Sequence, residues 1–487
     1  MISPGCRKIS WVIGSFFLLL LSSSCRQPEG PGQTGEGMVV IRDVSVIDVV
    51  GENTLSGVDI AIDSQTIADV GSGIAAEYPD ARVIDGAGAF VIPALTDSHV
   101  HVDTTARVEL MLPEASGLEF AIEELEEDLG VYPLFGITTV VVLDGSPEQL
   151  ELKARANRAN WTMPRVVLAT PILDGQESGN PLHTKVASPE EANQRLSEYL
   201  GESYDLVKVY TFLDGPTYLS VLERCAELGI PVWGHLPKDL PLEEALDPRL
   251  TNVAHAEELT RSWDGEDPLF AARVADLLIE RGISLTPNLV AYDEIIAEVE
   301  DLDAHLATKD WGMVNPLARI YSLVPYNGYV EDFGGEDIRD RVLGYFRRQH
   351  AEMFEIVRLM AERGGTLLAG SDAGNPTMYP GDGLHRELEL LVAAGLNPYR
   401  ALAAATVTPS IVLGESDQRG RIEPGELAEL VLLESDPIQD IKNTRDITGL
   451  YSRGEYVDRS MLAARRDRLT SSFEIREARY REHLPAK

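Results

Sequence analysis

The sequence predicts an α/β fold: a (β/α)8 TIM barrel with a small β-sandwich formed from both chain ends. Apolar strand-like runs alternate with amphipathic helical runs in the middle of the chain, and short alternating runs occur near both ends. Alternating strands and helices are typical of a parallel barrel, whose active site lies at the carboxyl ends of its strands. A doubly wound open sheet is the competing topology, but the sequence lacks a Gly-rich dinucleotide motif or a Walker A loop to support it.

The central domain, residues 95–410, is predicted to be the barrel. Its strand candidates are Thr96–Val102, Thr138–Leu143, Arg165–Ala169, Leu206–Tyr210, Val232–His235, Asn252–His255, Ser284–Pro287 and Thr366–Ser371. The connection 291–364 is far longer than one βα unit and contains several aromatic residues. Two interpretations stay open for this insertion: a lid or specificity wall of the site, or a helical addition that packs its own small core.

Residues 38–94 and 411–460 are assigned to the composite β-sandwich. Four runs between Met38 and Val70, and two near Glu429–Leu433 and Gly449–Val457, alternate as strands do. Neither set is long enough to bury a sheet face alone, so we expect the two ends to combine. Residues 461–487 are expected to form a C-terminal helical tail.

The first 25 residues have the pattern of an export signal. Arg7 and Lys8 precede the apolar run Trp11–Leu21, and three serines lead to Cys25. This pattern predicts a signal peptide with a lipobox in 1–25, followed by a flexible tether in 26–37. We expect a lipoprotein anchored at the bacterial cell envelope, in the periplasm or at the outer membrane. Because Leu21 lies one position further from Cys25 than the usual lipobox places it, a plain secretory signal is the alternative.

The charge balance excludes two classes of partner. Asp and Glu number 79 against 42 Lys and Arg, a net charge of −37. Such a chain repels nucleic acid phosphates and anionic lipid surfaces, so we expect no nucleic acid partner and membrane contact only through the lipid anchor. A small-molecule substrate is the expected partner, and the oligomeric state is not predicted.

Histidines and one aspartate mark the ends of the predicted strands. His99 and His101 are two residues apart in the first strand, so both imidazoles project to one face. His235 and His255 end two later strands, and Asp372 follows the eighth. The first and eighth strands of a closed barrel are neighbours, which brings Asp372 beside His99 and His101. Imidazoles with a carboxylate suit zinc, and nickel, manganese or iron are alternatives.

Lys208 is unusual because it interrupts the apolar strand Leu206–Tyr210. An unpaired ammonium group inside a barrel is very costly. A neutral lysine amine can instead react with CO2 to give an anionic carbamate whose two oxygens bridge two cations. A lysine that reaches solvent or pairs with an acid is the alternative. Its coincidence with four strand-end histidines favours the carbamate, and therefore two divalent metal ions.

Several motifs resemble those of the amidohydrolase superfamily, in its imidazolonepropionase-like and prolidase-like branch. They are Thr96–His101, Phe135–Thr139, Asp205–Tyr210, Gly370–Asp372, and Pro398–Leu413 followed by Gly420–Leu433. Two positions depart from the family pattern: Ala94 stands where Gly is usual, and Glu429 where Asp is usual. Both lie outside the ligand set, so the expectation of metal binding is unchanged.

The resemblance implies a metal-dependent amidohydrolase that cleaves a C–N bond in an amide, a cyclic amide or a dipeptide-like substrate. The implied metal ligands are His99, His101, Lys208 as its carbamate, His235, His255 and Asp372. A hydroxide bridging two metal ions, zinc by expectation, would attack the scissile carbonyl, and Asp372 would pass its proton to the leaving amine. Tyr210 and His183 are the substrate-binding candidates; a structural hydroxyl and a surface histidine are the alternatives.

Two other functions remain open from the sequence. A lactone or phosphoester hydrolase could use the same site, because a two-metal centre serves several electrophiles. A noncatalytic envelope-binding lipoprotein could retain the barrel as a scaffold. The complete ligand set argues against this second hypothesis, because a site that no longer binds metal is expected to have lost at least one ligand.

Overall fold

The structure is a computed structural model that describes residues 37–111, 121–322, 338–374 and 377–483. The predicted signal peptide, lipobox and tether, apart from Gly37, lie outside the described residues. Among the helices in the described ranges, none is both long and apolar enough to span a bilayer.

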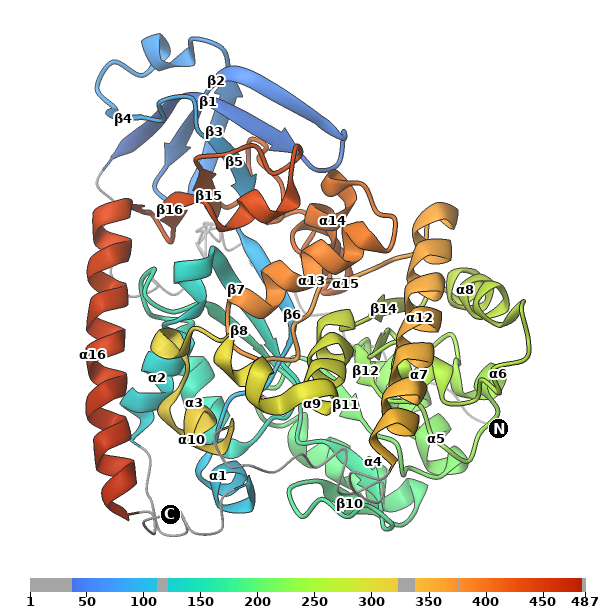
Figure 1. Cartoon of the computed structure of the whole chain (residues 1–487). Coiled ribbons are helices and arrows are strands. Elements are labelled where there is room, and N and C mark those ends of the chain that lie inside the picture. The colour runs from blue at the N-terminus through green and yellow to red at the C-terminus, as the bar shows by residue number, and fades with distance from the viewer. Residues whose placement is uncertain (1–36, 112–120, 323–337, 375–376, 484–487) are drawn as a thin grey trace, which may run out of the picture. The chain divides into compact units, whose positions relative to one another are not determined.

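Strands from both ends of the chain share one mixed sheet of eight strands, drawn in blue and red in Figure 1. Its order is β17–β16–β15–β5–β1–β2–β3, and β4 pairs with β1. The strands are β1 Met38–Asp48, β2 Asn53–Asp63, β3 Thr66–Gly71, β4 Arg82–Asp85, β5 Phe90–Pro93, β15 Leu430–Leu433, β16 Ile447–Ser452 and β17 Glu455–Asp458. The two ends join where β15 pairs antiparallel with β5. Ile41 and Ile60 from one end and Leu430 from the other pack in a common apolar core.

This sheet differs from the prediction in two details. The predicted runs Met38–Asp43 and Val46–Val50 belong to one strand, β1, whose register shifts between Ile41 and Val44. Asp43 lies in this irregularity with a left-handed φ of 56°, so its polar character marks a bulge rather than the end of a strand. Strands β4 and β5 were not among the predicted strands.

Two parallel sheets carry seven of the eight predicted central strands. The first has the order β6–β7–β8, and the second has the order β10–β9–β11–β12–β13–β14. The bounds are β6 Leu95–Val100, β7 Ile137–Val142, β8 Arg165–Leu168, β9 Leu173–Gly175, β10 Thr184–Val186, β11 Val207–Val209, β12 Val232–Gly234, β13 Asn252–Ala254 and β14 Ser284–Thr286. A single parallel bridge between Ala169 and Leu206 links the two sheets. The fold is therefore α/β, with the predicted strands parallel and consecutive.

The predicted eighth strand, Thr366–Ser371, is not a regular strand. Its segment is attached by single parallel bridges, from Leu367 to Leu285 of β14 and from Ala373 to Val100 of β6. A Cβ atom at Gly370 would lie 2.7 Å from Cγ2 of Thr286 and 2.9 Å from Cβ of His99. This close approach favours glycine over the side chains that normally stabilise a strand, and the ladder is interrupted here.

Helices alternate with the parallel strands (Figure 1). They are α1 Thr105–Met111, α2 Ile122–Leu129, α3 Pro147–Ala156, α4 Pro189–Tyr199, α5 Gly215–Leu228, α6 Leu242–Ala245, α7 Glu257–Thr260, α8 Phe270–Arg281, α9 Leu289–Ala307, α10 Pro316–Ser322, α12 Arg339–Arg363, α13 Asp382–Ala393, α14 Pro398–Ala404, α15 Val407–Val412 and α16 Arg459–His483. Ser146, Ser188 and Asp214 cap α3, α4 and α5 by accepting a backbone N–H from the first turn. These helices begin where the sequence combines a capping residue with a proline in the first turn.

The long insertion after β14 contains α9, α10 and α12, and residues 323–337 within it lie outside the described residues. Trp311, one of the aromatic residues of this insertion, packs against Tyr379 with ring centroids 5.3 Å apart. No described residue of 291–364 lines the cavity that contains the predicted site residues His99, His101 and Asp372. The C-terminal helix α16 docks through Arg476, whose buried guanidinium donates to Oδ1 of Asp128 at 2.8 Å.

Candidate metal centre and active site

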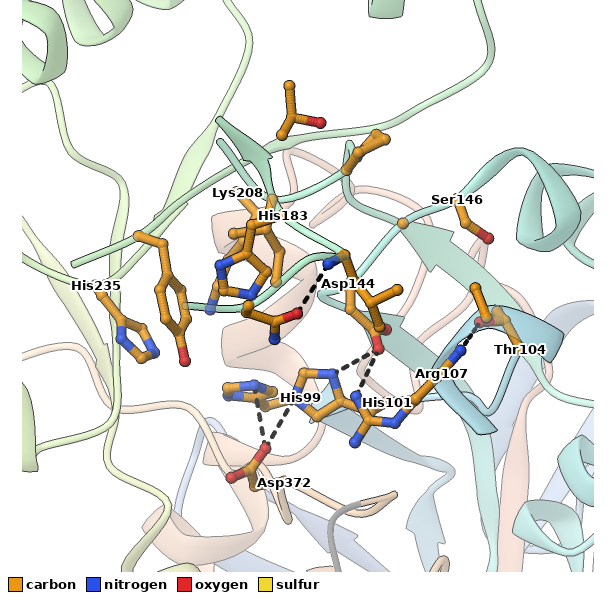
Figure 2. A pocket seen from close by; sticks show the side chains of 18 of the residues that line it. His99, His101, Thr104, Arg107, Asp144, Ser146, His183, Lys208, His235 and Asp372 are labelled. Atoms are coloured by element: carbon orange, nitrogen blue, oxygen red, sulfur yellow. Dashed lines mark hydrogen bonds and ion pairs between the residues drawn. The ribbon is translucent and has the colours of Figure 1, made fainter. Parts of the chain in front are cut away.

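A cavity of about 550 Å³ lies at the carboxyl ends of the parallel strands (Figure 2). Its lining contains every site residue that the sequence predicts: His99, His101, His183, Lys208, Tyr210, His235, His255 and Asp372. A cavity of this size accommodates a small molecule. The structure therefore brings together residues that are up to 273 positions apart, from His99 to Asp372.

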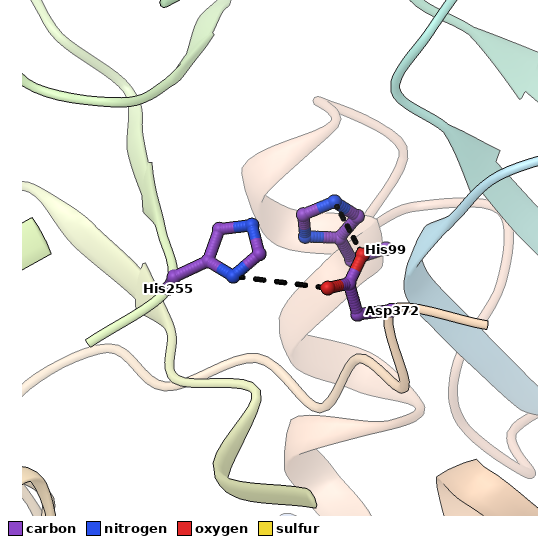
Figure 3. Close-up of side chains that lie close together, drawn as sticks. All are labelled: His99, His255 and Asp372. Carbon is purple, nitrogen blue, oxygen red and sulfur yellow. Dashed lines mark ion pairs between the residues drawn. The ribbon is translucent and has the colours of Figure 1, made fainter. Parts of the chain in front are cut away.

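Asp372 lies at the centre of the histidine cluster. Its Oδ1 atom is 3.4 Å from Nε2 of His99 and 3.1 Å from Nε2 of His101. Its Oδ2 atom is 3.9 Å from Nδ1 of His255, and Figure 3 shows the Asp372 carboxylate joined by ion pairs to both the His99 and the His255 ring. One donor atom from each of His99, His255 and Asp372 lies within 4.8 Å of the others. This spacing is suitable for donors that share a metal ion.

The protonation states in the cluster also suit metal ligation. Burial lowers the pKa of His99 and of His235 well below the ordinary value, and it lowers the pKa of His255 to about 3. These imidazoles are therefore neutral, as a metal ligand must be. Burial alone would raise the pKa of Asp372, but the histidines around it lower its pKa below the ordinary value. His101 is the imidazole that can carry the opposing charge, because Asp144 and Asp372 raise its pKa against burial. Asp372 is therefore a carboxylate.

Lys208 lies on β11 with a fully buried side chain. Its Nζ atom has no hydrogen-bond partner among the described residues. Burial lowers the pKa of Lys208 from 10.5 to about 8, so roughly a tenth of the amine is neutral at pH 7, far more than for an exposed lysine. A buried amine without a hydrogen-bond partner, beside neutral imidazoles and a carboxylate, fits a carbamate that bridges two cations.

Further polar residues orient the histidines, and sequence reasoning missed them. Nδ1 of His101 lies 3.1 Å from Oδ2 of Asp144, and Nδ1 of His99 lies 3.2 Å from Oδ1 of Asn288. Nδ1 of His235 lies 3.2 Å from Oε1 of Glu258. Each partner directs the opposite ring nitrogen toward the cavity, as outer-shell groups do around metal ligands. Asp144 and Asn288 closely follow a predicted strand, and that position was the available signal.

Three of the site residues lie at left-handed turns that end their strands. The φ angles are 73° at His255, 49° at Asn288 and 57° at Asp372. Residues other than glycine adopt this conformation at a cost of about 1–3 kcal/mol, and such residues cluster at functional sites. The sharp turns bring these side chains to the cavity immediately after β13, β14 and the 366–373 segment.

The two substrate-binding candidates are neighbours. The Tyr210 ring stacks on His235 with centroids 3.8 Å apart, and the His183 ring meets Tyr210 edge-on at 4.7 Å. His183 is held by Asp174, whose buried Oδ2 is 2.8 Å from its Nδ1. Burial raises the pKa of Tyr210, so its hydroxyl keeps its proton. The surface-histidine alternative for His183 is wrong, because its side chain is only 6% exposed.

A further acid, Glu257, lines the same cavity two residues after His255. Burial raises its pKa to about 7, and a hydrogen bond from Tyr292 opposes part of that shift. Sequence reasoning did not single out this residue, although it follows a predicted strand.

Comparison with known proteins agrees with this geometry. The pattern of the Amidohydrolase family matches residues 90–457. The chain belongs to the amidohydrolase family, and this membership supports a hydrolase acting on carbon–nitrogen bonds.

Individual relatives are more distant. An adenine deaminase from Moorella thermoacetica is 23% identical over 384 residues, which cover 77% of this chain and 51% of that protein. The chain spans only 10% of the adenine deaminase from Listeria monocytogenes that it matches. Among solved structures, bottromycin amidohydrolase has a TM-score of 0.65 at 22% identity, covering 89% of this chain and 90% of its own. A Xaa-Pro dipeptidase with bound methionine has a TM-score of 0.64 at 18% identity, covering 87% and 100%. These structures share the fold.

Proposed function

We propose that the protein is a binuclear metal-dependent amidohydrolase that cleaves the C–N bond of an amide, a cyclic amide or a dipeptide-like small molecule. The observation that carries this proposal is the buried Lys208 amine, which has no hydrogen-bond partner among the described residues and shares one cavity with four strand-end histidines and Asp372. One metal ion would not require a ligand at Lys208, whereas a bridging carbamate needs a lysine in this position.

The proposed ligands are His99, His101, His235, His255, Asp372 and the Lys208 carbamate. The carbamate would form when the neutral Nζ lone pair attacks the carbon of CO2: an N–C bond forms, one C=O π bond breaks with its electron pair moving to oxygen, and nitrogen releases one proton to water. When bound, two divalent cations, zinc by preference, lower the pKa of a water and polarise the scissile carbonyl. His99, His235 and His255 are neutral and Asp372 is ionised, as ligation requires. His101, whose pKa its acidic neighbours raise, would release its proton when a metal binds.

The residues of the chain supply proton transfer and orientation. Asp372 is ionised and central, so it can accept a proton from the attacking water at a carboxylate oxygen and deliver it to the leaving nitrogen. The protonated hydroxyl of Tyr210 can donate to a substrate oxygen, and Asp174 holds the His183 ring at the cavity wall.

The remaining parts of the proposal concern architecture and location. We assign β6, β7, β8, β11–β14 and the 366–373 segment to a (β/α)8 barrel spanning residues 95–410. The strands of both chain ends are assigned to a sandwich in 38–94 and 411–460, with a helical tail at 461–487. Export with lipid attachment at Cys25 is proposed from the sequence of residues 1–25 alone.

The test is hydrolysis by zinc-loaded protein of dipeptides, N-acyl amino acids, hydantoin-like rings and lactones, with Asp372→Asn assayed in parallel. The likeness in fold to a Xaa-Pro dipeptidase makes dipeptides the first substrates to try. We expect amide hydrolysis that a chelator abolishes and that Asp372→Asn lowers by at least about a hundredfold. Activity that neither treatment changes would refute the mechanism. Cleavage of lactones but of no amide would favour the alternative hydrolase.

A further inference from the structure

Two adjacent acids at the cavity have different surroundings. Glu258 is satisfied inside the protein: its Oε2 accepts the backbone N–H of Leu236 at 2.8 Å and pairs with Arg261. Its Oε1 lies 3.2 Å from Nδ1 of His235. Glu258 therefore has no acceptor capacity directed at a ligand, and its role is to hold the His235 ring.

Glu257 lines the cavity and forms no ion pair among the described residues. The Tyr292 hydroxyl donates a hydrogen bond to its carboxylate, which fixes the orientation of that group from α9. Tyr292 is itself buried and packs edge-on against Phe346 at 5.7 Å. The protein thus positions the carboxylate, and Arg261, which is paired with Glu258, is the cation that stabilises its charge from a distance.

The other charged groups of the cavity are already engaged. Arg107 is the one cationic lining side chain in the described ranges besides Lys208 and the histidines. It lies 3.2 Å from Oδ2 of Asp144 and 3.5 Å from Oδ1 of Asp103, and it donates to the carbonyl of Gly374 at 2.9 Å. Asp144 in turn pairs with His101. Among the acids of the lining, Glu257 is therefore the one with no close ion pair to a side chain in the described ranges.

The location of Glu257 sets it beside the reacting centre. His255 has a left-handed φ of 73°, which reverses the chain, and α7 begins at Glu257. The hydrogen bond from N–H of Ala256 to the carbonyl of Pro287, at 3.0 Å, ties this turn to the end of β14. Glu257 and the proposed metal ligand His255 therefore belong to the same cavity wall.

We infer that Glu257 binds a cationic group of the substrate, and that the substrate is an aminoacyl compound with a free α-amino group. A dipeptide or an amino acid amide has this group, whereas an N-acylated amino acid, a hydantoin-like ring and a lactone do not. This inference rests on the proposed function and selects among its substrate classes. A half-buried carboxylate at a cavity wall that forms no close ion pair is costly, and an ammonium group of the substrate supplies that partner.

The test compares matched substrates, a series of dipeptides and the same dipeptides acetylated on nitrogen. For the metal-loaded wild-type enzyme we expect kcat/KM to be about 10–100-fold higher for the free amine, the size of a lost charged hydrogen bond. Glu257→Gln should remove most of this preference by raising KM for the free amine. Tyr292→Phe should reduce it partly. Glu177→Gln, an exposed acid paired with Lys238, is the matched control and should keep the preference.

Binding measurements separate this inference from the proposed function. Calorimetry with L-leucine and N-acetyl-L-leucine should show tighter binding of the free amine to the wild type and equal binding to Glu257→Gln. Equal binding of both compounds to the wild type, or a preference that survives in Glu257→Gln, would overturn the role of Glu257. If neither substrate form is cleaved, the proposed function fails, and calorimetry alone decides whether Glu257 recognises an amine.

Discussion

Nδ1 of His101 lies 3.1 Å from Oδ2 of Asp144, while Nε2 of the same ring faces Asp372 at 3.1 Å. Burial lowers the pKa of the His101 imidazole, and Arg107 lowers it further. Asp144 and Asp372 outweigh both effects, so the pKa of His101 is raised above its ordinary value. The carboxylate of Asp144 therefore fixes the ring orientation and raises its basicity. Such a carboxylate typically strengthens the ligand on its other side.

Replacing Asp144 with Asn keeps an acceptor near His101 but removes the charge. We predict that Asp144→Asn weakens zinc binding by about 10–100-fold, as loss of an outer-shell partner does. Competition with a chromophoric chelator measures this affinity, with Glu177→Gln as the surface control. Wild-type affinity in Asp144→Asn would show that His101 needs no such support.

The Lys208 carbamate should depend on pH because only the neutral amine reacts with CO2. The pKa of Lys208 is about 8, so the reactive fraction grows as the pH rises through that value and declines below it. We predict that zinc reconstitution of metal-free protein in bicarbonate is several-fold faster at about pH 8.5 than at about pH 6.5. The rate of zinc uptake is measured by quenching the reaction with chelator at set times and determining the zinc bound to the protein.

Lys208→Arg is the companion variant, since its side chain stays protonated and cannot form the carbamate. It should bind less zinc and lose the dependence on bicarbonate. Full zinc content in Lys208→Arg would contradict the carbamate.

We predict that Glu387, which is not one of the proposed metal ligands, makes the free energy of unfolding depend on pH. It is fully buried and accepts the backbone N–H groups of Leu289 at 3.1 Å and Val290 at 2.8 Å. Burial raises its pKa from 4.5 to about 8. Between these values the folded protein holds a proton that the unfolded chain has lost, so the free energy of unfolding falls as the pH rises, by at most about 1.4 kcal/mol per pH unit.

Urea unfolding at several pH values between about 5 and 8 measures this slope. Glu387→Gln should flatten it, because glutamine does not titrate. The exposed Glu362→Gln should leave the slope unchanged. A slope identical in Glu387→Gln and wild type would assign the dependence to another group.

The docking of α16 gives a prediction about stability. Arg476 is buried and its guanidinium contacts Asp128 at 2.8 Å. Arg476→Met leaves the Asp128 charge buried without its main partner, so we predict a loss of about 3–5 kcal/mol in the free energy of unfolding. Arg481→Met removes an exposed pair with Glu477 on the same helix and should cost less than about 1 kcal/mol. Similar losses in the two variants, by urea unfolding, would refute this difference.

The positions of the predicted ligands could be inferred from the sequence because the carboxyl ends of neighbouring parallel strands lie close together, independently of the loop conformations. His99, His235 and His255 each lie in or directly after a short apolar run, and the parallel pairing brings them together. Lys208 was recognisable because a cation inside an apolar strand conflicts with burial.

Other features were not predictable from the same pattern. The 366–373 segment resembles a strand in hydrophobicity, but the close approach of Gly370 to His99 interrupts its ladder. Asp144 and Glu257 each follow a strand, as many solvent-exposed acids do. Only the three-dimensional structure distinguishes these two cavity residues from ordinary surface acids. The bulge at Asp43 has the polar character of a turn, so one strand was predicted as two.

Zinc stoichiometry tests the central claim most directly. Protein reconstituted with zinc and bicarbonate, then freed of excess metal, should contain two zinc ions per chain by elemental analysis, and Lys208→Met should contain at most one. The same preparation should hydrolyse an amide in proportion to its zinc content. A wild-type protein that retains one zinc ion or none at full activity, or a Lys208→Met variant that still binds two, would contradict the binuclear centre.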